Sequence, residues 1–110
     1  MNTTRFLITL LSALPVAAAG GEIYGKVSLG GTPVGADVTV AAQCGSTSYP
    51  AVTTDKAGSY NLVVAETGRC LLTITRAGLS TQLAVASYDD AAQADIVLEL
   101  RDGALVARRR

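Results

Sequence analysis

The chain has 110 residues, in which nine lysines and arginines balance nine aspartates and glutamates, and it contains no histidine. The lack of histidine excludes Ser-His-Asp and Cys-His catalysis and every zinc site that includes histidine. Because three of the basic residues are the last three of the chain, the rest is mildly acidic, which argues against a nucleic-acid partner.

The first 19 residues have the composition of a secretory signal peptide. Arg5 provides the positive charge, residues 6–14 form a short apolar run, and Ala17 to Ala19 provide the small side chains that signal peptidase needs. The run is shorter than the roughly 20 residues of a membrane-spanning helix, so we expect no transmembrane segment; an uncleaved anchor is the alternative. We therefore expect residues 1–19 to be removed and the remaining chain to be secreted or periplasmic.

The rest of the chain alternates apolar and polar residues with a period of two, which is typical of strands with one buried face. The predicted strands cover residues 23–29, 38–44, 60–64, 70–75, 79–85, 94–100 and 104–107, with a further short segment at 51–54. Turn residues separate them at intervals of roughly eight to twelve residues, which indicates an all-β sandwich or barrel of about seven strands. We expect one domain over residues 20–107.

The three arginines that end the chain follow the last predicted strand. We expect Arg108 to Arg110 to form a separate basic tail that is solvated and frayed. The alternative is that this tail docks on an anionic surface such as envelope lipid.

The two cysteines, Cys44 and Cys70, both continue the apolar side of their predicted strands. Both thiols should therefore point into the core, where a bridge would join two strands. In an oxidising compartment two inward cysteines of a small domain favour a disulfide over two free thiols. On the chain-entropy model such a bridge stabilises the fold by roughly 3–4 kcal/mol.

Three stretches of the chain, GKVSLGGTPVGADVTV, TTDKAGSYNLVV and TGRCLLTI, resemble the carboxypeptidase regulatory-like domains. The first contains the turn at Gly31 and Pro33, and the second contains the turn from Asp55 to Gly58 that leads to Tyr60. The resemblance implies a Greek-key-like, seven-stranded β-sandwich of the transthyretin (prealbumin) type that acts as an accessory or binding module. The related hydroxyisourate hydrolases need active-site histidines, so the resemblance does not extend to that activity.

Several polar residues are candidates for a site, each with a simpler structural interpretation. Asp55 could belong to a calcium loop, but it is the only carboxylate of its turn, and we expect it to cap that turn. For the cluster of Asp89, Asp90 and Asp95 we expect a solvated acidic loop, with a weak cation site as the alternative. Lys26 and Asp95 could form an isopeptide bond, but both fall on the polar side of their strands. We therefore expect no metal site and no cofactor.

No paired carboxylates, nucleophile–base set or metal cluster is visible, so the sequence predicts that the chain is not an enzyme. We expect an exported, non-enzymatic module for protein–protein interaction or structural support in the cell envelope, with another envelope or secreted protein as its partner. Exposed strand edges would supply the contact by strand addition. The alternative is a carbohydrate or small-ligand binding domain that uses Tyr24, Tyr49 or Tyr88 and the loops.

Overall fold

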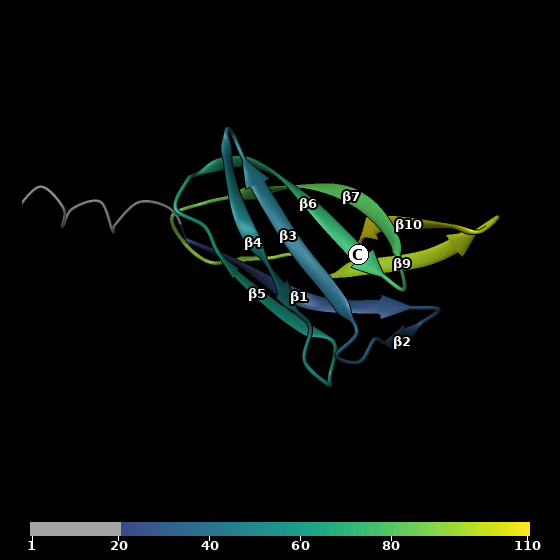
Figure 1. Cartoon of the computed structure of the whole chain (residues 1–110). Helices are drawn as coiled ribbons and strands as arrows, with labels where there is room; N and C mark the ends of the chain where they lie inside the picture. Colours follow the sequence, from purple (N-terminus) through teal and green to yellow (C-terminus); the bar gives the residue numbers. More distant parts are fainter. Residues whose placement is uncertain (1–20) are drawn as a thin grey trace, which may run out of the picture.

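The computed structural model describes residues 21–110, which consist of strands joined by turns (Figure 1). The predicted signal peptide, residues 1–19, lies outside the described residues. Within residues 21–110 there is no helix of the length and apolarity needed to cross a membrane.

Ten strands form two sheets. The strands are β1 (Glu22–Leu29), β2 (Thr32–Pro33), β3 (Val38–Cys44), β4 (Thr47–Thr53), β5 (Ser59–Val63), β6 (Gly68–Arg76), β7 (Leu79–Ser87), β8 (Ala92–Gln93), β9 (Ile96–Arg101) and β10 (Ala104–Arg109). The six-stranded sheet has the order β10-β9-β1-β2, and β5 and β8 also pair with β1; the four-stranded sheet has the order β4-β3-β6-β7. Strand β1 is therefore the centre of its sheet, with β5 and β2 antiparallel to it and β8 and β9 parallel to it.

The core lies between the two sheets and is built from the inward-facing side chains, which occupy every second position of a strand. In β3, for example, residues at every second position from Val38 to Cys44 are buried, while the residues between them are half-buried or exposed. The largest fully buried side chains come from both sheets and include Ile23, Leu62, Leu72, Ile74, Ile96 and Leu98. The predicted all-β sandwich is thus confirmed, and the period-two pattern identifies the inward residues.

The described residues form ten strands where about seven were expected, because the short strands β2 and β8 were not predicted. Among the predicted strands, the boundaries of β4 and β10 differ most. Strand β4 begins at Thr47, earlier than predicted, because Gly45 adopts a positive φ of 62° and lets β3 turn directly into β4. Strand β10 continues to Arg109, and Arg108 and Arg109 pair with Val97 and Ile96 of β9. The predicted separate tail is therefore wrong for these two residues, because the β9–β10 ladder still offers them pairing partners.

The two cysteines lie opposite each other on neighbouring strands of the four-stranded sheet. Cys44 of β3 and Cys70 of β6 are register partners, and their sulfur atoms lie 2.04 Å apart, at disulfide distance. Both side chains are buried beneath the sheet. A bridge at this position joins the two central strands of the four-stranded sheet.

Candidate functional site

The outer face of the six-stranded sheet carries two adjoining depressions that share Lys26 and Asp95. The larger has a volume of about 650 Å³ and lies along β1 and β9, where Arg108, Arg110 and Glu99 also line it. The smaller, of about 560 Å³, lies between β1, β5 and β8 and includes Tyr24 in its wall. We call this pair of depressions, with Lys26 and Asp95 between them, the Lys26–Asp95 surface.

Strand alternation explains why β1 presents Tyr24 and Lys26 to this surface. Ile23, Gly25 and Val27 are buried, so the residues between them must point outward. Tyr24 keeps 37% of its surface exposed although it stands in the middle of a sheet.

Asp95 is placed by the junction between two parallel ladders. Strand β8 ends at Gln93 and β9 begins at Ile96, so β1 loses its pairing partner between them. The Asp95 carboxylate fills this gap, because its Oδ1 accepts a hydrogen bond of 2.9 Å from the backbone N–H of Lys26. The side chain of Gln93 also donates to Asp95, at 3.3 Å. Asp95 therefore has a structural role in addition to its place in the depressions.

The segment that carries Asp95 is held close against β1 and β5. A Cβ atom at Gly25 would lie 2.4 Å from the carbonyl oxygen of Ala94, so only glycine allows this approach. The hydroxyl of Tyr60 donates a hydrogen bond of 2.5 Å to the same oxygen. Burial, followed by the nearby Asp95 carboxylate, raises the pKa of Tyr60, and its hydroxyl stays protonated as a donor.

Arg108 and Arg110 line the larger depression, and Arg109, which does not line it, attaches the end of β10 to the β8–β9 junction. Arg109 donates to the carbonyl oxygen of Gln93 at 2.6 Å, and the backbone N–H of Arg110 donates to the carbonyl oxygen of Asp95 at 3.0 Å. Glu99 accepts hydrogen bonds from Arg101 and lies 3.6 Å from Arg108, and the contact with Arg101 chiefly lowers the pKa of Glu99. The depression therefore combines fixed positive and negative groups.

Of the three tyrosines that the sequence analysis named as candidate ligand-binding residues, only Tyr24 lines one of the two depressions. The hydroxyl of Tyr49 donates to Glu66 at 2.5 Å and accepts from the backbone N–H of Ala65 at 2.9 Å. Glu66 also accepts from Thr47, so these groups attach the β5–β6 connection to β4. Tyr88 is 60% exposed in the loop that follows β7.

The acidic residues also separate. Asp55 Oδ1 accepts from the backbone N–H groups of Ala57 and Ser59, each at 2.9 Å, and these bonds lower the pKa of Asp55. Asp55 therefore caps its turn. Asp95 is engaged at the β8–β9 junction, and no group of three or more metal-ligating side chains occurs among residues 21–110.

Sequence reasoning singled out Tyr24, Lys26 and Asp95 for separate reasons, and the structure brings them to one surface. It did not identify Glu99 and Gln93 as part of this surface. Their outward position was visible in the alternation of the last strands. Their place on the same surface as Lys26 was not visible, because it depends on β8 and β9 pairing in parallel with β1.

Comparison with known proteins gives a fold. No family model matches the chain, and no curated protein is similar to it in sequence. The structure is similar to that of Klebsiella pneumoniae 5-hydroxyisourate hydrolase, with a TM-score of 0.55 and 15% sequence identity over 82% of this chain and 93% of the other. At this identity the likeness establishes a shared fold.

The prediction that this chain is not an enzyme is contradicted by the comparison, because a solved structure with the same fold, the 5-hydroxyisourate hydrolase, is an enzyme. The prediction relied on motifs visible along the sequence. In a β-sandwich, however, reactive groups from separate strands can meet on one face without forming any local motif. The absence of such motifs from the sequence is therefore a weak argument against an enzyme. What the comparison does support is the predicted architecture: the chain has a transthyretin-like β-sandwich fold.

Proposed function

We propose that this chain is an exported β-sandwich module of the carboxypeptidase regulatory-like kind, which binds a partner protein of the cell envelope through the Lys26–Asp95 surface. The observation that carries the proposal is that two adjoining depressions share Lys26 and Asp95. A protein segment lying across β1 would reach both depressions at once.

The chemistry of the surface supports a protein partner. Tyrosine and arginine are the residue types most often found at the energetic centres of protein interfaces, and this surface contains Tyr24 and Arg108. Charges of both signs would select a partner whose charges are complementary and would speed its association. Because the depressions are open, an extended segment fits them better than a fully enclosed small molecule.

Strand addition at a sheet edge, the contact expected from the sequence, has less support. The edge strand β4 carries Pro50, which has no backbone N–H to donate to an added strand. Prolines of this kind protect exposed edges against pairing. Strand addition at β4 is therefore disfavoured, and we place the partner on the sheet face because the two depressions lie there.

Export rests on two features. The cysteine pair at disulfide distance fits a compartment that permits disulfides, and residues 1–19 have the composition of a signal peptide. Both support a periplasmic or secreted protein.

A second candidate, binding of a carbohydrate or small polar ligand, is favoured by the smaller depression alone. Tyr24 is the register partner of Asn61 on β5 and of Gln93 on β8, so an aromatic ring stands between two amide side chains. The volume of about 560 Å³ falls within the usual range of ligand sites. A sugar could stack on the ring and bond to the amides.

Site-specific photo-crosslinking tests the proposal. A photoreactive residue in place of Tyr24 should capture one protein of the envelope. The same residue in place of Gln82, on the outer face of the other sheet, should not capture that protein. The variant Lys26→Glu should abolish the capture, because it reverses a charge between the depressions. Capture of the same envelope protein from both positions would contradict the proposal.

A sugar-binding experiment on the same protein tests the second candidate. Tyrosine fluorescence should change on addition of the correct sugar and not in Tyr24→Ala, if the smaller depression binds carbohydrate. If the photoreactive residue at Tyr24 captures no protein and sugar binding is saturable, the second candidate replaces the first.

A further inference from the structure

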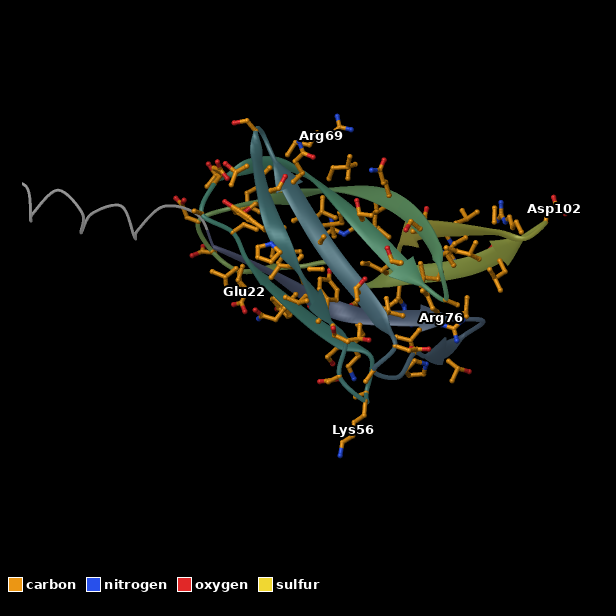
Figure 2. The ribbon with its side chains drawn as sticks, viewed as in Figure 1. Glu22, Lys56, Arg69, Arg76 and Asp102 are labelled. Carbon is orange, nitrogen blue, oxygen red and sulfur yellow. A yellow bond between two sulfur atoms is a disulfide. The ribbon has the colours of Figure 1, made fainter. Side chains whose placement is uncertain are left out.

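The outer face of the four-stranded sheet lacks the charges found on the opposite side of the molecule. In β3, β4, β6 and β7, all of which lie in the described part, the only charged residues are Arg69 and Arg76. Figure 2 shows these two at opposite ends of β6. The surface of a small monomeric domain is usually about a quarter to a third charged, so the face between the two arginines is unusual.

Hydroxyl groups form a row across this face. Thr39 pairs with Thr53 on one side and with Thr75 on the other, and Thr75 pairs with Ser80. The hydroxyls of Thr75 and Ser80 lie 2.8 Å apart. In the next outward row, Thr73 lies between Ala41 of β3 and Gln82 of β7.

We propose that this face associates with the same face of a second copy of the chain. A copy meets no like charge across the centre of the face, which removes the usual obstacle to self-association. Hydroxyl and amide groups both donate and accept hydrogen bonds, so the rows are complementary to themselves. A two-fold axis in the plane of contact gives a closed dimer.

The charges at the ends of the face select the orientation. Arg69 lies at one end, and Asp37, which is 3.3 Å from Arg76 and about half exposed, lies at the other. With the two β6 strands antiparallel, Arg69 of each copy lies over the Asp37–Arg76 ion pair of the other, in which Asp37 is the more exposed partner. With the strands parallel, Arg69 of one copy would face Arg69 of the other, and the two like charges would repel each other.

The size of the face indicates a weak dimer. Four strands about 4.8 Å apart and about seven residues long cover roughly 450 Å² per copy. Stable interfaces bury about 800 Å² per partner. We therefore expect a dissociation constant between about 10 μM and 1 mM.

Sedimentation of the exported protein over that concentration range tests the proposal. The expected result is a concentration-dependent monomer–dimer equilibrium that Thr73→Glu weakens by about tenfold or more, because it places like charges opposite each other. Asn61→Glu, on the outer face of the other sheet, is the matched control and should leave the equilibrium unchanged. A monomer at the highest concentration, or equal effects of the two variants, would overturn the proposal.

A charge exchange keeps the test independent of folding defects. Arg69→Glu and Asp37→Arg should each weaken the dimer, and the double variant should restore it. Because these residues stand at opposite ends of the face within one copy, rescue requires contact between copies. Failure of the double variant to recover, with the circular dichroism spectrum unchanged, would overturn the antiparallel arrangement. Chemical-shift changes on dilution that fall on β1 and β9 would overturn the choice of face.

Discussion

The two outer faces of the sandwich obey the same alternation but present different chemistry. On the six-stranded sheet the outward positions hold Tyr24, Lys26 and Glu99 beside two depressions. On the four-stranded sheet the outward positions between Arg69 and Arg76 are uncharged. Burial depends on the period of the pattern, whereas the use of a face depends on which polar residues occupy the outward positions.

Removal of the cysteine pair should have the largest effect, and it acts beneath the uncharged face. Cys44→Ala with Cys70→Ala should lower the free energy of unfolding by roughly 3–4 kcal/mol, because the unfolded chain loses its cross-link. Urea unfolding measures the change. Thiol titration of the denatured, unreduced protein is the control, and two reactive thiols per chain would show that no bridge forms.

A methyl group at Gly25 should disturb the charged surface. In Gly25→Ala the new Cβ would meet the Ala94 carbonyl at 2.4 Å, so the strand that positions Asp95 must move. We expect a loss of about 1–3 kcal/mol in the free energy of unfolding.

The matched control is Gly35→Ala, because a Cβ atom there has no neighbour within 4 Å and Gly35 is not among the glycines with positive φ. This variant should change the unfolding free energy by less than about 0.5 kcal/mol. Equal losses in the two variants would show that close approach to Ala94 is not the cause.

Removal of one hydroxyl should have a smaller effect on the same segment. Tyr60→Phe loses the bond to the Ala94 carbonyl, and we expect a cost of about 1 kcal/mol at neutral pH. Because the pKa of Tyr60 is raised in the folded state, its contribution is complete below the unfolded pKa and is lost as the pH rises above it. The stability of the parent protein should therefore fall more steeply than that of the variant above pH ~10. Parallel curves from chemical unfolding would contradict this.

The smallest effect concerns Glu66, in the connection between the two sheets. Hydrogen bonds from Thr47 and then Tyr49 lower the pKa of Glu66, so its contribution is present above the unfolded pKa and is lost as the pH falls. Thermal unfolding between neutral and acidic pH should show a slightly smaller decrease in melting temperature for Glu66→Gln than for the parent chain. Glu22→Gln serves as a comparison on the six-stranded sheet. A larger decrease in Glu66→Gln would contradict the assignment.

Local sequence was sufficient for much of the fold. The alternation of apolar and polar residues identified the buried side of β3, and it placed Cys44 and Cys70 inward. The turn at Asp55 and Gly58 was recognisable because a capping carboxylate and a residue with positive φ are needed within four positions. Such features depend on neighbours in the chain, which a sequence displays directly.

The site depended on tertiary structure. Lys26 and Asp95 are 69 positions apart, and they meet only because β1 exchanges β8 for β9 as its parallel partner at that point. Arg108 and Arg109 became part of a strand because β9 lies beside them. The residues that face the core could be identified along the chain, because alternation is a local pattern. The outward residues that share a surface could be identified only in the folded protein, because strand order brings distant parts of the chain together.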